Sequence, residues 1–263
     1  MQCLVDGRSA YVGTGGRAID AARESVVFVH GVGQNHTIWV LPTRHFVRKG
    51  FNVVSVDLPG HGRSAGPCLS SIEQMAEWVA EVLSVTGLAR AALVGHSMGS
   101  LVALAMAAQH PDRVRSLAMV ATAVPMPVSE ALLETSAAND HTALDMMLTL
   151  WGHSSTAHLG GSPTPGLWML GCGLRLMEES GRDVVHTDLN ACNQYTEGLG
   201  HATRIACPTL LILGERDALT PVRATHALAD AIPTVATVVL PGAGHALLSE
   251  RPDPVLDALI RIV

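Results

Sequence analysis

Short apolar runs recur along the chain, and most of them are apolar at consecutive rather than alternating positions. They cover residues 26–29, 53–56, 91–94, 116–121, 209–213 and 236–240. Consecutive apolar positions are typical of strands that are buried on both faces of a mostly parallel sheet. The residues before Val26 allow a short antiparallel hairpin at one edge of that sheet.

Helix-like segments separate these runs. Ser70 and Glu73 predict a capping box ahead of a helix that ends at Gly87. A second helix is expected from 98 to 109, and a third begins at Thr220, as N-cap, before Pro221. The last runs from about 253 to the C-terminus. Strands that alternate with helices predict a mostly parallel, doubly wound α/β sheet.

This alternation stops between residues 124 and 205. The segment is rich in Met and Trp and holds a Gly/Pro-rich stretch at 160–166. We therefore expect a core made of residues 1–123 and 206–263. Residues 124–205 are expected to form a helical lid, inserted after the sixth strand when the N-terminal hairpin is counted.

Composition narrows the possible partners. Hydrophobic residues make up 48% of the 263 positions and the net charge is −6, with no run of Lys or Arg. Neither a nucleic acid nor a membrane is therefore an expected partner. No signal peptide or membrane-spanning stretch is visible, so a soluble cytoplasmic protein is expected. The five cysteines form no C-x-x-C motif and are interpreted as reduced thiols.

The segment Gly95-His96-Ser97-Met98-Gly99 matches the pattern G-x-S-x-G. An apolar, strand-like run precedes it and a helix-like run follows. In that setting the chain turns sharply from strand to helix and exposes the serine hydroxyl at the tip of the turn. We therefore interpret Ser97 as a nucleophile.

A serine nucleophile needs a base, and a base of this kind is oriented by an acid. His245 follows the last strand-like run within a Gly-rich loop, at the same sheet edge as Ser97. Asp217 and Glu215 both follow the run 209–213. Spacing alone does not separate these two carboxylates.

Acyl transfer also needs donors for the developing oxyanion. The N–H of Met98 is one candidate, and the N–H of Val32 in His30-Gly31-Val32-Gly33 is the other. His30 is expected to brace that loop. The loop from Asp57 to Ser64 is interpreted as a tight turn that Asp57 holds through Arg63 or through backbone groups.

Together these motifs resemble the α/β-hydrolase superfamily across nearly the whole chain. They are His30-Gly31, the 57–64 loop, the Ser97 pentapeptide, the 207–217 block and Gly244-His245. The resemblance places the acid at Asp217 rather than Glu215. Ser97 argues against dehalogenases and epoxide hydrolases, which use a nucleophilic Asp. Ser100, where many relatives carry Gly, is a mild departure that is expected to affect helix–strand packing.

The resemblance implies a hydrolase that cleaves a small-molecule carboxylic ester without metal or organic cofactor. The Met, Leu and Trp content of the lid favours an apolar acyl or alcohol group of small to medium size. A lactone or carbon–carbon bond hydrolase is the alternative, which an Arg or Lys in the pocket would favour. A non-catalytic ligand receptor is a second, less favoured alternative. Candidate substrate-binding residues are Trp39, Trp151 and Trp168, although Trp39 is expected equally to pack beneath the lid. Nothing in the pattern indicates an oligomeric state.

Overall fold

A computed structural model describes residues 1–158, 166 and 168–263. Its centre is a sheet with the strand order β1-β2-β4-β3-β5-β6-β7-β8. The strands are β1 (Gln2–Val5), β2 (Arg8–Gly13), β3 (Ser25–Val29), β4 (Asn52–Val56), β5 (Ala91–His96), β6 (Val114–Val120), β7 (Thr209–Gly214) and β8 (Val235–Leu240). β1 and β2 form an antiparallel hairpin, β2 is also antiparallel to β4, and β3 to β8 run parallel. The predicted α/β class is confirmed.

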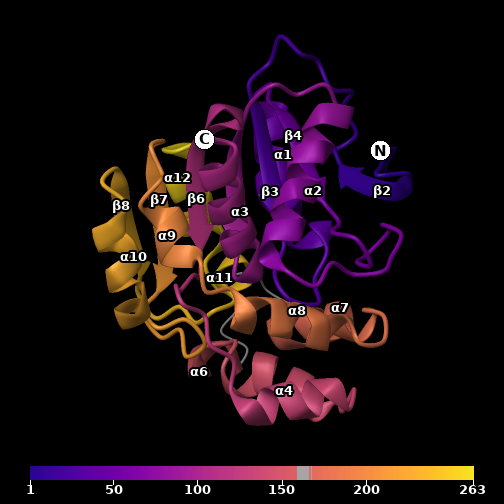
Figure 1. Cartoon of the computed structure of the whole chain (residues 1–263). Helices are drawn as coiled ribbons and strands as arrows, with labels where there is room; N and C mark the ends of the chain where they lie inside the picture. Colours follow the sequence, from indigo (N-terminus) through magenta and orange to yellow (C-terminus); the bar gives the residue numbers. More distant parts are fainter. Residues whose placement is uncertain (159–165, 167) are drawn as a thin grey trace.

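Helices cover both faces of the sheet (Figure 1). One face carries α2 (Ile72–Val85), α3 (Met98–Gln109) and α10 (His226–Ala231); the other carries α1 (Val40–Arg48), α11 (Leu247–Glu250) and α12 (Pro252–Ile260). Short 3₁₀ turns are η1 (His36–Trp39), η2 (Pro111–Arg113) and η4 (Val222–Thr225). Because both faces are covered, neighbouring residues of β3 enter different cores, Val27 and Val29 one and Val26 and Phe28 the other.

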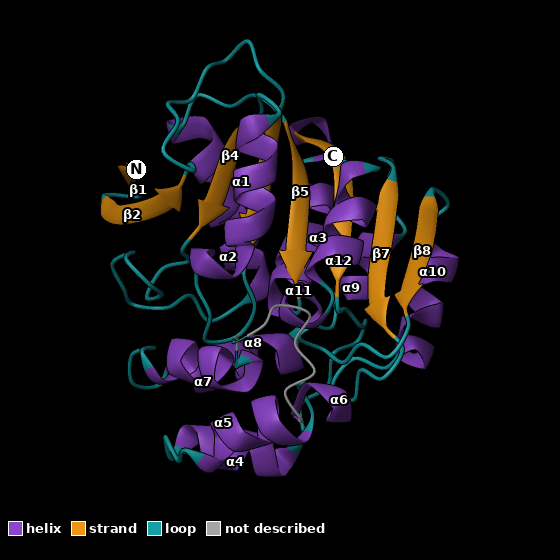
Figure 2. Cartoon of the chain, turned by 180° about the vertical axis from the view of Figure 1, so that it is seen from behind, coloured by secondary structure: helices purple, strands orange, loops and turns teal. Residues whose placement is uncertain are grey.

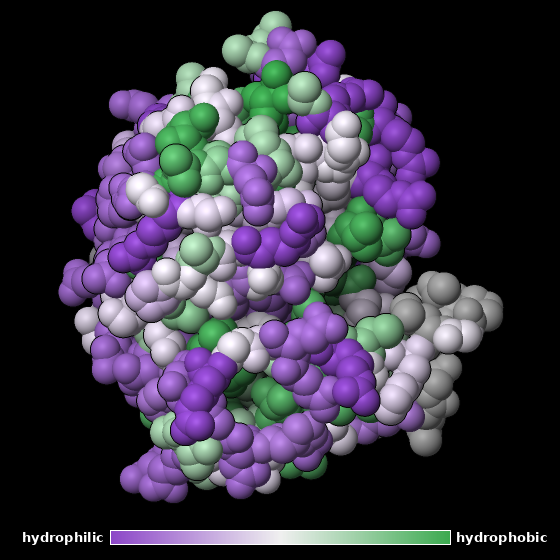
Figure 3. Space-filling view, turned by 90° about the vertical axis from the view of Figure 1, so that its right-hand side faces the viewer, coloured by the Kyte–Doolittle hydropathy of each residue, from purple (hydrophilic) through white to green (hydrophobic). Residues whose placement is uncertain are grey.

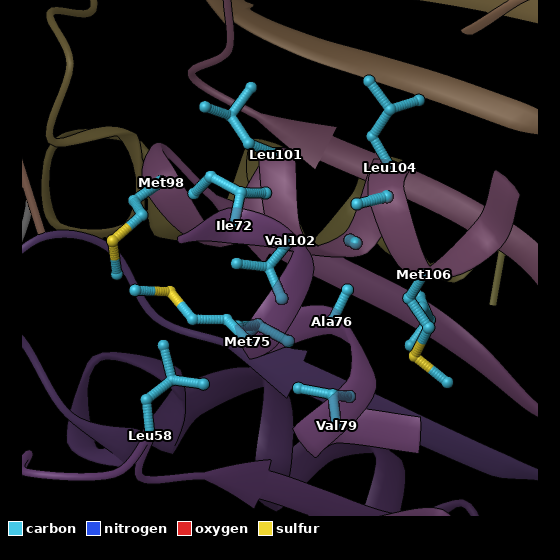
Figure 4. Close-up of a cluster of buried hydrophobic side chains, with 14 of the residues drawn as sticks. Leu58, Ile72, Met75, Ala76, Val79, Met98, Leu101, Val102, Leu104 and Met106 are labelled. Carbon is cyan, nitrogen blue, oxygen red and sulfur yellow. The ribbon is translucent and has the colours of Figure 1, made fainter. Parts of the chain in front are cut away.

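Helix α3 lies against α2 and against the central strands. Figure 4 shows Ile72 and Met75 of α2 near Met98 and Val102 of α3, all of them fully or almost fully buried. The Met98 side chain therefore anchors the start of α3 in the core. Its backbone remains at the carboxyl end of β5, where the site is built.

Two predicted helix starts are shifted. The N-cap of α2 is Ser71 rather than Ser70, because the Ser71 hydroxyl accepts the Gln74 N–H. Gln74 Oε1 accepts the N–H of Ser70, the residue before the N-cap, so the pair of bonds is a variant of the capping box shifted by one residue. Thr220 caps no helix, since its side chain turns to Asp217 instead.

The described residues of 124–205 are helical and contain no strand. They form α4 (Glu130–Ala137), α5 (Thr142–Asp145), the π-helical turn η3 (Met146–Leu150), α6 (Ser155–His158), α7 (Met169–Glu178), α8 (Val184–Gln194) and α9 (Gly198–Ala202). The Gly/Pro-rich stretch at 160–166 lies outside the described residues, apart from Gly166. In Figure 2 the arrowheads of β5 and β7 point toward the level of α7 and α8, so these helices lie at the carboxyl edge of the sheet.

Helix α9, at the end of the expected lid, packs on α3 and α10 in the helix layer of the core. The boundary of the lid at residue 205 stays a prediction. Within the described part of the chain, no helix is both long and apolar enough to cross a membrane.

Candidate active site

Ser97 occupies a sharp turn between β5 and α3. Its backbone has φ 54° and ψ −121°, a conformation that non-glycine residues rarely adopt. The turn is tight because Gly95 and Gly99 lack side chains: a Cβ on Gly95 would lie 2.0 Å from the Gly99 oxygen, and one on Gly99 would lie 2.3 Å from the Val29 oxygen. The predicted strand–turn–helix context of Ser97 is present.

Ser100 supports this turn in a way that the sequence did not indicate. Its hydroxyl lies 2.6 Å from the Ser97 carbonyl oxygen and 2.7 Å from the Thr122 hydroxyl. The single hydroxyl proton of Ser100 thus has two acceptors within reach, the Ser97 carbonyl oxygen and the Thr122 hydroxyl oxygen. The serine side chain that replaces Gly at position 100 therefore forms a hydrogen bond with the backbone of the nucleophile.

His245 follows β8 and lies between Ser97 and Asp217. Its Nε2 is 2.9 Å from Ser97 Oγ, and its Nδ1 is 2.9 Å from Asp217 Oδ2. His96 donates from Nε2 to the His245 carbonyl oxygen at 3.1 Å. Burial, together with the neighbouring His245, lowers the pKa of His96 to about 3, so His96 is a neutral brace for this loop.

Asp217 is buried and accepts three hydrogen bonds besides the one from His245. Leu219 and Thr220 donate backbone N–H groups to Oδ1, and the Thr220 hydroxyl donates to Oδ2 at 2.7 Å. Burial alone would raise the pKa of Asp217, but the charge of His245 and these donors outweigh it and hold the pKa below its usual value. Asp217 is therefore a carboxylate at neutral pH.

Glu215, the other candidate for the acid, forms a hydrogen bond with the loop after β8 rather than with the His245 imidazole. Its Oε2 accepts the Gly242 N–H at 2.8 Å, and the side chain is exposed. A second carboxylate, Glu250, was not singled out from the sequence. It is buried and accepts the N–H groups of Gly244 and Ser154, so it joins the His245 loop to the insertion.

The loop after β3 brings Val32 next to Ser97, and both residues line the same pocket. Met98 is the first residue of α3, so its N–H has no partner within the helix. His30 braces the loop as expected, since its Nε2 accepts the Leu58 N–H at 3.1 Å. Asp57 holds the 57–64 turn through the backbone N–H groups of Arg63 and His36.

The pocket beside Ser97 and His245 has a volume of about 240 Å³. Its described lining includes Met126, Leu132, Met147, Trp151, Leu189 and Cys192, and contains no Arg, Lys, Asp or Glu among the residues that the structure describes. Four of these side chains come from the insertion's helices or from η3. Figure 3 shows hydrophobic atoms set back among hydrophilic ones at the level of these helices.

The three tryptophans have different positions. Trp151 lines the pocket, as expected. Trp39 does not, because it is fully buried and its ring stacks on Phe28 in the core. Trp168 is 67% exposed at the start of α7 and lines none of the described pockets. The assignments of Trp39 and Trp168 to the substrate pocket were therefore wrong. The sequence shows that a residue is aromatic, but it does not show in which direction the side chain points.

Comparison with known protein families identifies the family of this chain. The sequence model of the alpha/beta hydrolase fold matches residues 24–162, and a model of TAP-like proteins matches residues 186–261. The chain belongs to the α/β-hydrolase family. It is thus an α/β hydrolase, and the family suggested by its motifs is confirmed.

Two relatives of this α/β hydrolase have named activities. A pimeloyl-[acyl-carrier protein] methyl ester esterase of Chromobacterium violaceum is 32% identical over 243 residues, which cover 87% of this chain and 90% of the relative. An (E)-2-((N-methylformamido)methylene)succinate hydrolase of Acinetobacter baylyi is 25% identical, with 90% and 89% covered. The enol-lactonase of Burkholderia xenovorans LB400 has a similar structure, with a TM-score of 0.86, 23% identity, and 99% and 98% covered.

Proposed function

We propose that this α/β hydrolase cleaves the carboxylic ester of a small-molecule substrate through an acyl-enzyme formed on Ser97. One observation carries the proposal: His245 lies 2.9 Å from both Ser97 Oγ and Asp217 Oδ2. That arrangement supplies a nucleophile, a base within hydrogen-bonding reach and an acid that orients the base. The esterase among the relatives supports the same bond type.

The reaction proceeds in two halves. Ser97 Oγ attacks the ester carbonyl carbon while His245 Nε2 takes the hydroxyl proton, and the Val32 and Met98 N–H groups donate to the oxyanion. The tetrahedral intermediate collapses, the C–O bond to the alcohol breaks, and His245 gives its proton to the leaving oxygen. A water molecule then attacks the acyl-enzyme, with His245 as base, and releases the carboxylic acid and free Ser97.

Asp217 acts through His245. It accepts a hydrogen bond from the Nδ1–H group, so Nε2 is the nitrogen that faces Ser97, and the negative charge of Asp217 stabilises the imidazolium that forms. Thr220 keeps Asp217 in place by donating to the same oxygen. None of these steps requires a metal ion or organic cofactor.

The pocket favours an apolar acyl or alcohol group of modest size. A volume of about 240 Å³ lies below the usual 300–1,000 Å³ of ligand pockets. Arg175 of the insertion lines a different cavity and pairs with Glu178 at 2.7 Å. The absence of a basic residue from the described lining favours an ester over the carbon–carbon hydrolase alternative, whose substrate would bring a carboxylate.

A panel of substrates tests this assignment. The protein is expected to hydrolyse p-nitrophenyl esters of short and medium acyl chains and to react with a fluorophosphonate probe. Lactones and ring-cleavage products serve as the comparison. A higher kcat/KM for a ring-cleavage product than for every ester would overturn the ester assignment, and inertness toward every substrate and the probe would favour a receptor.

A further inference from the structure

Asp188 of α8 joins the helical insertion to the loop that carries Val32. The side chain is fully buried. Its Oδ2 accepts the backbone N–H of Gly33 at 2.9 Å and lies 2.8 Å from His61 Nε2. One carboxylate oxygen of the insertion therefore contacts two loops of the core, those after β3 and after β4.

The geometry around His61 requires a charged imidazole. Its Nδ1 faces the Pro59 carbonyl oxygen at 3.1 Å, while its Nε2 faces the Asp188 carboxylate. Both acceptors need a proton from the ring, and only the imidazolium carries a proton on each nitrogen. His61 and Asp188 thus form an ion pair with side chains 1% and 0% exposed. Removing one partner of such a buried pair is strongly destabilising locally.

The backbone that this pair holds is the one adjacent to the oxyanion donor. Gly33 follows Val32 and has φ +62°, and a Cβ on it would lie 2.9 Å from Cγ2 of Val185, so α8 packs directly on this glycine. On the other side of Val32, the Gly31 N–H is bonded to the Gln34 side chain at 3.1 Å. The Val32 N–H therefore lies between two anchored residues, and α8 supplies one of the anchors.

We propose that Asp188 is a positioning residue for the oxyanion hole, so that the helical insertion completes the geometry of the reaction as well as shaping the pocket. This inference rests on the acyl-transfer function proposed above. Asp188 touches no substrate and acts only by fixing where the Val32 N–H points.

The variant Asp188→Asn tests this role with little change of volume. The amide carries no negative charge to pair with the His61 imidazolium, so the anchor on the Gly33 backbone weakens and the Val32 N–H loses its fixed direction. Complete loss of one oxyanion donor costs about 10²–10³ in rate, so a misdirected donor is expected to lower kcat about 10- to 100-fold. KM for a p-nitrophenyl ester is expected to stay within about threefold, because the ground-state carbonyl depends little on this donor.

The matched control is Asp183→Asn, at the exposed start of the same helix, where the carboxylate bonds to Asn139 of the insertion. It is expected to keep wild-type kcat. An alkyl boronic acid forms a tetrahedral adduct on the serine, and its Ki is expected to rise for Asp188→Asn in proportion to the loss of kcat. A general loss of stability would not produce this proportionality. A kcat for Asp188→Asn within twofold of the control, or an unchanged boronate Ki, would overturn the inference.

His61→Gln provides a second variant, which also decides the question if Asp188→Asn does not fold. The Gln amide still donates to Asp188 but carries no charge, so kcat is expected to fall about 3- to 10-fold with KM unchanged. An unchanged kcat in this variant would contradict the inference. Because wild-type hydrolysis is measured in parallel, failure of the proposed function appears as an inactive wild-type protein and is distinct from failure of this inference.

Discussion

The Thr220 hydroxyl lies 2.7 Å from Asp217 Oδ2, the same oxygen that accepts a hydrogen bond from the Nδ1–H group of His245. Thr220 also donates its backbone N–H to the other oxygen of this carboxylate. The acid is therefore held by a residue three positions away, in the turn that follows β7. Glu215, two positions before Asp217, bonds to Gly242 instead.

The first prediction concerns these two carboxylates. Asp217→Asn is expected to lower kcat by about 10⁴, since an amide would hold His245 in the wrong tautomer and the corresponding change in a serine protease has that effect. Glu215→Gln, the matched control, is expected to stay within about tenfold of wild type. Steady-state kinetics with one ester decide between them, and a larger loss in Glu215→Gln would show that the acid was assigned wrongly.

The second prediction concerns the pocket wall. Trp151→Ala enlarges the pocket beside Ser97 and is expected to move the preferred p-nitrophenyl ester toward longer acyl chains. Trp168→Ala removes an exposed ring and is expected to leave the chain-length profile unchanged. Labelling by a small phosphonate is expected to stay within about tenfold in both variants, or about 1.4 kcal/mol. Equal profiles in all three proteins would mean that Trp151 does not define the pocket.

The third prediction is the pH dependence of the buried His61–Asp188 pair. Burial alone would lower the pKa of His61, but the charge of Asp188 and its hydrogen bond outweigh it and hold the pKa above its usual value. A base with a raised pKa stabilises the fold fully below its unfolded pKa of about 6.5, and that contribution is lost as pH rises through the folded pKa. The gap in Tm between wild type and Asp188→Asn is therefore expected to be largest near pH 6 and to narrow in alkaline buffer.

Neighbouring groups do not reverse this direction. Those that act on His61 or Asp188 in the described chain are His30, Asp57, Cys68 and Cys192. Burial and the charge of His61 lower the pKa of His30 to about 4, so His30 stays neutral across this range. Thermal melts of both proteins from pH 6 to pH 9 measure the gap, and a gap that widens with pH would contradict a charged His61.

The fold could be predicted because local patterns dictate it. Runs such as 26–29 and 91–94 are apolar at every position, which is typical of strands buried on both faces, and the observed strands begin and end within about two residues of these runs. Ser97 carries its own signal in the flanking glycines. His245 and the pair Asp217 and Glu215 were found because the carboxyl ends of parallel strands meet at one edge, and the family resemblance then selected Asp217.

The remaining site residues depend on contacts between distant segments. Asp188 lies 155 positions from Gly33 and Glu250 lies 96 from Ser154, and neither spacing has a pattern. Thr220 looked like a helix cap because Thr-Pro often begins a helix, but the buried carboxylate beside it is a stronger acceptor. Trp39 and Trp168 were assigned by residue type, whereas burial and orientation decide which aromatic rings line a pocket.

The central claim is that Ser97 is the nucleophile, and covalent labelling tests it most directly. Wild-type protein and Ser97→Ala are incubated with a fluorophosphonate, and the adduct is located by mass spectrometry of the intact chain and of its peptides. Ser100→Ala serves as the control for a neighbouring hydroxyl. We expect one adduct on the peptide containing Ser97 in wild type and in Ser100→Ala, and none in Ser97→Ala, which also loses esterase activity while keeping its circular dichroism spectrum. Labelling or ester hydrolysis that persists in folded Ser97→Ala would contradict the account.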